Sequence, residues 1–406
     1  MAPIRIALIG LSASAKVNWA EQAHLPYLLS PRGKSHYEIV ALLNSSVQAA
    51  EKAREQYNLP SCVKVYGSPD NLAADPDVDL VVCNTRVDTH LATTAPSLRK
   101  GKAVYIEWPL AESYDAAVGE LDARVDDAAS IIGLQGRVSP VALKLKEVLR
   151  SGRIGKVLSS DVRAFRNLGA GASVADSLAV PESLAYFTDR KVGGNHITIA
   201  FAHTIDYVHS VLGEFDLGTM SSRMQVQRPV LRISDTNREV MSDVPDLLAV
   251  HGRLVARGDA ERGISIAEDA TLSFTFRSGQ QFKGQPGLVW TINGEKGEIM
   301  VTASGAYFHM DPPDYTVDVK LHDHETDQVE DIEWDWQAWQ KELPSLSRNV
   351  AELYERFADW WENGRAPGDL PEEREWPRVH DALGRLNELK EMFRQYDRQR
   401  RSETSE

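Results

Sequence analysis

The chain has 406 residues, of which 42% are hydrophobic and 26% are charged, a composition typical of globular proteins with more than one domain. Its formal net charge of −14 at pH 7 argues against direct binding to nucleic-acid phosphates. Two cysteines, Cys62 and Cys83, exclude a disulfide framework, and no apolar stretch is long enough to span a bilayer. Because residues 1–5 run directly into an apolar strand without a signal-peptide pattern, we expect a cytoplasmic protein with no membrane partner.

Short apolar runs alternate with amphipathic helices over the first third of the chain. We predict strands at 4–10, 37–43, 78–83, 103–107 and 131–135, each followed by a helix or a turn. This alternation favours an α/β Rossmann domain, a doubly wound parallel sheet that binds NAD(P), over residues 1–136.

The pattern changes after residue 136. A helix at 141–151 precedes longer alternating strands at 157–165, 247–256, 264–276 and 288–302, the last with a turn signal at 293–297. The small-residue segment 168–189 predicts a loop over the cleft, and the apolar face of 376–398 predicts a C-terminal helix. We therefore expect an α+β domain with an open, mostly antiparallel sheet over 137–406, serving substrate binding and dimerisation.

Small and neutral side chains follow the first two predicted strands. A dinucleotide loop needs small residues such as Gly10, Ser12 and Ala13, so that backbone N–H groups can reach the pyrophosphate. Small residues also serve ordinary turns, but the parallel-sheet context favours the cofactor interpretation. Asn44, Ser45 and Ser46 stand where a carboxylate would bind a ribose 2′-hydroxyl and repel a 2′-phosphate, with Lys52 and Arg54 beyond them.

The neutral end of the second strand favours NADP, with NAD as the alternative. Thr85, which follows the strand 78–83, belongs to the same predicted cofactor-binding set.

Three motifs together resemble one family. They are Glu107-Trp108-Pro109 in place of a Glu-Lys-Pro sequence, Gly193-Gly194 followed by His203-x-x-Asp206, and the turn Gly152-Arg153-Ile154-Gly155. The chain resembles the Gfo/Idh/MocA oxidoreductases over nearly its whole length. On residues 19–24, 104–108, 134–140 and 201–206 it is more similar to the fungal galactose-regulon repressor-like subgroup and its fungal oxidoreductases.

The resemblance implies roles for matching residues. The glutamate of the motif, here Glu107, holds the nicotinamide ribose, and the lysine that follows it assists proton transfer. Trp108 replaces that lysine, and since an indole cannot exchange a proton near neutral pH, it can contact cofactor and substrate or merely pack. Ile199 replaces an aspartate, which leaves His203 as the motif's acid or base, with Asp206 as a substrate-binding residue or its neighbour.

Further polar residues complete the candidate site. His196 is a candidate for substrate binding. Tyr186 is either a second proton donor or a packed aromatic side chain. Arg137 either clamps the cofactor carboxamide or a carboxylate, or bridges the domains. Neither cysteine has a partner at metal-ligand spacing, so we predict no metal site.

Three functions fit these residues. The first is an NADP-dependent oxidoreductase that acts on an unidentified small molecule, with His203 or Tyr186 as the proton relay. The second is a non-catalytic NAD(P)-binding transcriptional regulator with a protein partner and a nuclear location. The third is an enzyme of non-redox chemistry. The resemblance also implies a homodimer.

Overall fold

The computed structural model describes residues 2–15, 18–121, 127–166, 179–255, 263–306, 308–310, 314–365, 370–371 and 374–403. The chain forms two compact units, one made of Met1–Val138 and Gln337–Leu386 and the other of Ser139–Trp336 and Asn387–Glu406. The first boundary lies close to the predicted one at 136. The segment 337–386, however, belongs to the first unit, whereas the sequence analysis assigned everything after 136 to the second.

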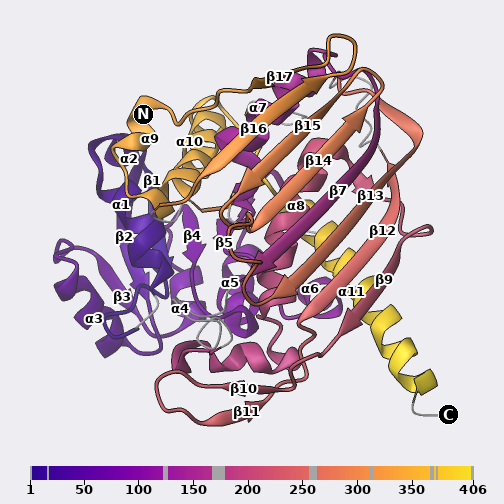
Figure 1. Cartoon of the computed structure of the whole chain (residues 1–406). Helices are drawn as coiled ribbons and strands as arrows, with labels where there is room; N and C mark the ends of the chain where they lie inside the picture. Colours follow the sequence, from indigo (N-terminus) through magenta and orange to yellow (C-terminus); the bar gives the residue numbers. More distant parts are fainter. Residues whose placement is uncertain are drawn as a thin grey trace. The chain divides into compact units, whose positions relative to one another are not determined.

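The first unit contains a six-stranded parallel sheet in the order β3-β2-β1-β4-β5-β6 (Figure 1). The strands are β1 (Ile4–Ile9), β2 (Tyr37–Leu43), β3 (Lys64–Tyr66), β4 (Leu80–Cys83), β5 (Ala103–Ile106) and β6 (Ser130–Ile132). The strands β4 and β5 are buried at every position, as expected for a sheet covered on both faces. The strand order reverses between β1 and β4, which is where proteins of this topology bind their ligands.

Helices connect the strands of this sheet. They are the π-helix η1 (Ala20–His24), the 3-10 helices η2 (Val87–Thr89), η3 (Asp127–Ala129) and η4 (Gln135–Val138), and the α-helices α1 (Leu25–Leu29), α2 (Pro31–His36), α3 (Val47–Gln56), α4 (Pro69–Ala73), α5 (His90–Arg99) and α6 (Tyr114–Glu120). Ser46 and Ser113 begin α3 and α6, since each side chain accepts a hydrogen bond from the backbone N–H three residues on.

The segment 337–386 joins the first unit through aromatic packing. It contains α9 (Ala338–Lys341), the 3-10 helix η9 (Ser345–Ser347), α10 (Arg348–Glu362) and the beginning of α11 (Val379–Glu403). Tyr354 of α10 stacks on Tyr27 with ring centroids 5.4 Å apart, and its carbonyl accepts a 2.6 Å hydrogen bond from the Tyr37 hydroxyl. Because these rings and Phe357 are fully buried with the strands of the parallel sheet, separating α10 from the sheet would expose the core.

The second unit contains a nine-stranded mixed sheet in the order β17-β16-β15-β14-β7-β13-β12-β8, with β9 paired to β12 (Figure 1). Its strands are β7 (Val157–Arg166), β8 (Glu214–Phe215), β9 (Ser221–Gln225), β12 (Leu247–Val255), β13 (Ile266–Ser278), β14 (Leu288–Gly294), β15 (Gly297–Ala303), β16 (Val317–Asp323) and β17 (Gln328–Asp331). All pairs are antiparallel except β7 with β13. A separate hairpin pairs β10 (Val230–Arg232) with β11 (Glu239–Met241).

The second unit also contains helices. They are α7 (Pro140–Arg150), the 3-10 helices η6 (Glu182–Thr188) and η7 (Arg190–Val192), the π-helix η8 (His196–Phe201) and α8 (Ala202–Leu212). Phe201 packs edge-on against Phe274 of β13 at 5.1 Å, and the ring of Tyr207 lies 6.1 Å from that of Trp290 on β14. These contacts fix η8 and α8, which carry the predicted motif residues, against the sheet.

The structure confirms the predicted fold class, a Rossmann-type parallel sheet followed by an α+β unit with a mostly antiparallel sheet. The predicted loop at 168–189 falls partly on residues 167–178, which lie outside the described residues, and η6 occupies its second half. The sequence analysis missed β3, β16, β17 and α10. The strands β3 and β17 are short, whereas α10 has a clear amphipathic pattern that the sequence analysis did not use.

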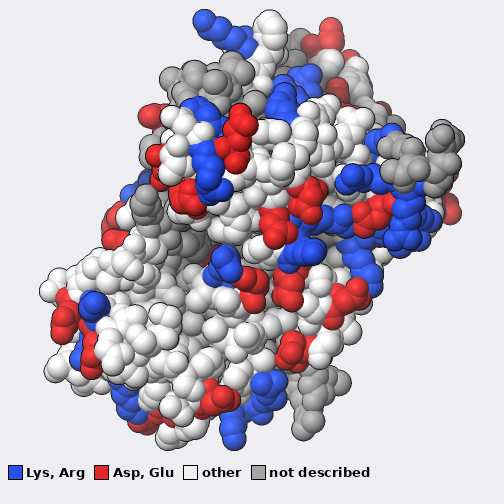
Figure 2. Space-filling model, turned by 90° about the horizontal axis from the view of Figure 1, so that it is seen from below, with Lys and Arg blue, Asp and Glu red and all other residues white. Residues whose placement is uncertain are grey.

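Two surface properties bear on partners. Within the described ranges, no helix has the length and apolar character required to cross a membrane. Acidic and basic side chains are interspersed over the face shown in Figure 2. The prediction that nucleic acid is not a direct partner stays a prediction.

Candidate functional site

A cavity of about 650 Å³ lies in the first unit, at the carboxyl ends of its central strands. It is lined by Ile9, Gly10, Ser12, Ala13, Ser14, Leu43, Asn44, Ser45, Ser46, Gln48, Ala49, Lys52, Gly67, Pro69, Thr85, Thr89 and Thr93. Seven of the residues predicted to bind the cofactor are therefore brought together here. They are Gly10, Ser12, Ala13, Asn44, Ser45, Ser46 and Thr85.

The backbone at Gly10 lets the loop after β1 approach the cavity. Its φ of +87° lies in the region that favours glycine, and an added Cβ would lie 2.9 Å from Thr85 Cγ2 and 3.1 Å from the Asn84 carbonyl carbon. Ser12 Oγ then accepts hydrogen bonds of 3.1 Å from the backbone N–H groups of Ser14 and Ala15. The loop is therefore a tight turn of small residues, the kind of cradle that a pyrophosphate requires.

The part of the cavity that follows β2 is lined by neutral and basic side chains. The Asn44 amide is held by the Leu11 carbonyl at 2.9 Å, and Ser46 caps α3. Lys52, six residues beyond Ser46 on α3, lines the cavity and forms no ion pair with an acidic side chain in the described part of the chain. Since no aspartate or glutamate is among the lining residues described, this end suits an anionic group better than a neutral ribose.

Glu107, at the end of β5, is held by a buried chain of hydrogen bonds. Its Oε1 lies 2.9 Å from His24 Nε2, and His24 Nδ1 lies 2.8 Å from the Tyr354 hydroxyl. A neutral imidazole satisfies both contacts, because Nε2–H donates to the carboxylate while Nδ1 accepts from the phenol. Gly133 leaves room for the carboxylate, since a Cβ there would lie 2.6 Å from Glu107 Oε2.

His24 and Tyr354 are site residues that sequence reasoning missed. His24 is 83 positions from Glu107 in the chain, and Tyr354 is 330 positions from His24, so no local sequence pattern connects the three residues. The matching segment 19–24 was the one signal that pointed to His24.

Trp108 is buried, with 5% of its surface exposed, and precedes a cis peptide bond to Pro109. The ring nitrogens of His90 lie 2.8 Å from the carbonyl oxygens of Pro109 and Thr85. This imidazole therefore ties the Glu107-Trp108-Pro109 turn to the loop that lines the cavity, and its burial lowers its pKa. The predicted contacts of Trp108 with cofactor and substrate stay predictions.

Arg137 of η4 is engaged within the first unit. Its Nη1 donates a 2.5 Å hydrogen bond to the Asp381 carboxylate, and both side chains are buried. This ion pair uses part of the guanidinium that the sequence analysis assigned to the cofactor or to a bridge between domains. A role of Arg137 toward the cofactor stays a prediction.

The second unit holds the remaining predicted residues. His203, on α8, stacks on His309 with ring centroids 4.1 Å apart and an interplanar angle of 7°. Asp206 is buried one turn further along α8. The sequence analysis did not single out His309, which lies more than a hundred residues from the motif histidine and has no motif of its own.

His196 and Tyr186 are packed in the same unit. His196 Nε2 lies 2.6 Å from the Pro245 carbonyl oxygen, and burial together with the nearby Arg166 charge lowers the pKa of His196 to about 4. The neutral ring donates through Nε2, so Nδ1 alone is left for the predicted substrate contact. The Tyr186 ring meets Phe187 edge-on at 4.9 Å, and its predicted role as a proton donor stays a prediction.

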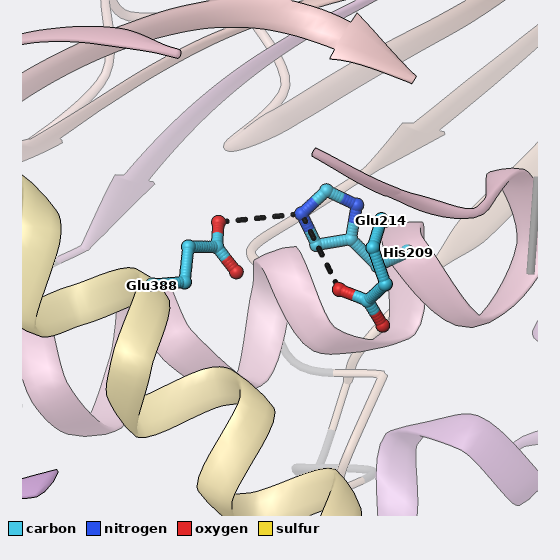
Figure 3. A group of neighbouring side chains, drawn as sticks. All are labelled: His209, Glu214 and Glu388. Atoms are coloured by element: carbon cyan, nitrogen blue, oxygen red, sulfur yellow. Dashed lines mark hydrogen bonds and ion pairs between the residues drawn. The ribbon is translucent and has the colours of Figure 1, made fainter. Parts of the chain in front are cut away.

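One group in the described residues has ligand atoms close enough to hold a metal ion. His209 Nε2 points toward Oε1 of Glu388 at 3.3 Å and toward Oε2 of Glu214 at 4.0 Å, as Figure 3 shows. His209 Nδ1 lies 2.6 Å from the Gly213 carbonyl oxygen. An imidazolium that donates from both nitrogens satisfies these contacts, so the geometry requires no metal and the absence of one stays a prediction.

The first unit has the fold of Rossmann-type nucleotide-binding proteins, with a cavity where such proteins bind their ligands, and comparisons identify the family. A family model described as an oxidoreductase family with an NAD-binding Rossmann fold matches residues 4–128. A dehydrogenase of Aspergillus oryzae, aclE, is 32% identical to the chain over 316 residues, which cover 76% of this chain and 80% of that protein. The chain belongs to the Gfo/Idh/MocA oxidoreductase family.

The second part of the chain is similar to a family of regulators. A model described as the Gal80p C-terminal domain matches residues 140–303. The GAL80 galactose/lactose metabolism regulatory protein of Kluyveromyces lactis is 26% identical over 319 residues, which cover 75% of this chain and 65% of that protein. A super-repressor mutant of Gal80p from Saccharomyces cerevisiae has the same fold, with a TM-score of 0.80, 21% identity, and coverage of 97% of this chain and 96% of that chain.

Proposed function

We propose that this protein is an NADP-dependent oxidoreductase that acts on a small molecule. The observation that carries the proposal is the cavity of the first unit, where Asn44, Ser45 and Ser46 stand beside Lys52 and no acidic side chain lines the described wall. A 2′-phosphate finds hydrogen-bond donors and a cation there, whereas the carboxylate that selects a ribose 2′-hydroxyl is missing. Similarity to a fungal dehydrogenase supports the redox assignment.

The residues present fit the cofactor. Gly10 keeps the cradle open, and Glu107, oriented by His24, is a buried acceptor for a ribose hydroxyl. When bound, NADP supplies the acceptor or donor of a hydride. The chain's own residues bind and orient the reactants and transfer the proton.

The proton relay falls to His203, because Trp108 and Ile199 cannot exchange a proton. Oxidation of a hydroxyl group releases a hydride from carbon and a proton from oxygen, and in this proposal His203 takes up the proton. Tyr186 is the alternative relay. The homodimer and the cytoplasmic location stay predictions.

A non-catalytic NAD(P)-binding regulator is the second candidate function. The match of residues 140–303 to the Gal80p C-terminal domain favours it, as does the loss of the lysine at Trp108. Such a protein would bind NADP and a protein partner without turnover. The two candidates therefore share the cofactor site and differ in whether His203 matters for chemistry.

The test compares NADPH and NADH binding by the protein and by two lysine variants. Lys52→Met removes the cation at the 2′-phosphate, so we expect the Kd for NADPH to rise by about ten- to a hundredfold while that for NADH stays unchanged. Lys100→Met, an exposed lysine outside the cavity, is the matched control and should change neither. Equal losses for both nucleotides, or none, would refute the NADP assignment.

Two further variants separate binding from chemistry. Gly10→Asp should abolish thermal stabilisation by NADPH, because its side chain fills the cradle and adds a negative charge. His203→Ala should keep NADPH binding and lose turnover in a screen of hydroxy compounds with NADP. Binding without turnover by the unmodified protein would favour the regulator.

A further inference from the structure

Arg166, the last residue of β7, has buried donors without acceptors. The side chain as a whole is half-buried, but its Nε and Nη1 atoms are fully buried and form no hydrogen bond in the described part of the chain. These two nitrogens carry three N–H groups. Its Cζ lies 5.7 Å from the centroid of the Phe187 ring.

An arginine in this position is costly unless something pairs with it. Buried guanidinium groups are normally paired with a carboxylate or a phosphate, because burial strips them of water. Across the described ranges, Arg166 forms no ion pair with an aspartate or a glutamate. Among the described residues, Arg166 is therefore a partly buried cation without an anionic partner.

The neighbours of Arg166 include His196, the candidate for substrate binding, and residues in contact with the candidate proton relays His203 and Tyr186. Its charge acts on His196 and on His309, both buried, and His309 stacks on His203. Phe187, which covers the guanidinium, meets Tyr186 edge-on. Arg166 thus belongs to the same group of side chains in the second unit as the predicted proton relays.

We propose that Arg166 binds a carboxylate of the substrate, which makes the substrate a hydroxy acid or the corresponding oxo acid. The inference rests on the proposed oxidoreductase function and deepens it by naming the substrate class. The charge carried by Arg166, His196 and His309 together favours a singly charged carboxylate over a phosphate ester. Burial and the Arg166 charge lower the pKa of His196 to about 4, and burial together with the neighbouring His203 and Arg166 lowers the pKa of His309 well below its usual value. Both of these imidazoles are therefore neutral, and among these three side chains the guanidinium supplies the positive charge.

The test measures thermal unfolding with three matched pairs of compounds. Each pair consists of a carboxylate and its neutral counterpart: lactate and propane-1,2-diol, mandelate and 1-phenylethane-1,2-diol, and glucuronate and glucose. The proteins are the unmodified chain, Arg166→Met, Arg166→Lys and the control Arg163→Met. Arg163 lies on the same strand, and its side chain is exposed.

We expect at least one carboxylate to stabilise the unmodified protein more than its neutral counterpart. In Arg166→Met the Kd for this carboxylate should rise at least about tenfold. Arg166→Lys should have an intermediate effect, and Arg163→Met should have none. Without ligand, Arg166→Met should unfold at a higher temperature, since it removes an unpaired buried charge. A lower unfolding temperature would show a structural role and overturn the proposal.

The proposal is also overturned if no carboxylate exceeds its neutral partner with the unmodified chain, or if Arg166→Met keeps the difference. None of these measurements uses the nucleotide. NADPH is added in a separate series, where it should stabilise all four proteins alike. Loss of that stabilisation in every protein would contradict the proposed NADP site and leave the carboxylate result standing on its own.

Discussion

Alanine at position 133 should displace Glu107, the residue that the cofactor proposal needs most. The added Cβ would lie 2.6 Å from Glu107 Oε2, 2.8 Å from its Cδ and 3.0 Å from its Cα. The carboxylate must move, and its hydrogen bond from His24 at 2.9 Å is then lost. Overpacking costs about 1–3 kcal/mol and a hydrogen bond to a charged group about 1.5–3 kcal/mol, so we expect a destabilisation of about 2.5–6 kcal/mol.

The assay is urea unfolding, followed by NADPH titration of the variant under native conditions. Gly384→Ala is the matched control, because Gly384 lies inside α11 with nothing within 4 Å of an added Cβ. That change should stabilise the protein by about 0.5–1 kcal/mol, since alanine is the better helix former. We also expect the Gly133→Ala variant to bind NADPH more weakly. If it unfolds at the same urea concentration as the unmodified protein and binds NADPH equally well, then Glu107 is not held as described.

Two other consequences of the structure can be measured. The folded-state pKa of His196 is about 4, against an ordinary value of 6.5, so the unfolded chain takes up the proton first as the pH falls. Stability should therefore decrease from pH 6.5 to pH 4 by about 3 kcal/mol from this group, and His196→Asn, which keeps an N–H for the Pro245 carbonyl, should show a shallower slope. An unchanged slope would assign the effect to other groups, such as His90, whose pKa burial also lowers. Because His209 can bind both carboxylates as an imidazolium, EDTA treatment should leave the unfolding temperature unchanged, and a clear decrease would point to a metal at His209, Glu214 and Glu388.

Local patterns were enough to predict the architecture and seven of the residues that line the cavity of the first unit. The strand 37–43 has the predicted bounds, and four more strands of the parallel sheet begin within two residues of their predicted starts. The loop at Gly10 and the neutral residues at Asn44, Ser45 and Ser46 follow these strands directly. Parallel strands bring their carboxyl ends to one edge of the sheet, so residues placed after the strands converge without any knowledge of side-chain packing.

The second unit was less predictable from local patterns. His196 lies on η8, and its ring is turned to the Pro245 carbonyl, a partner 49 positions away. Likewise, Arg137 and Asp381 form an ion pair although they are 244 positions apart, and no sequence pattern links them. Such contacts depend on which helix packs where, and a single sequence contains no periodic signal for them.

The sequence by itself determined the fold class, the family resemblance, the cofactor loop and the replacement of the motif lysine by Trp108, because each rests on residue types at short spacing. Only the tertiary structure decided how Glu107 is held, since His24 and Tyr354 come from elements far apart in the chain. The same holds for Arg166, which reads as an ordinary strand residue in the sequence. Its proposed role depends on the burial of its Nε and Nη1 atoms, and that burial is set by the side chains packed around it in the folded protein.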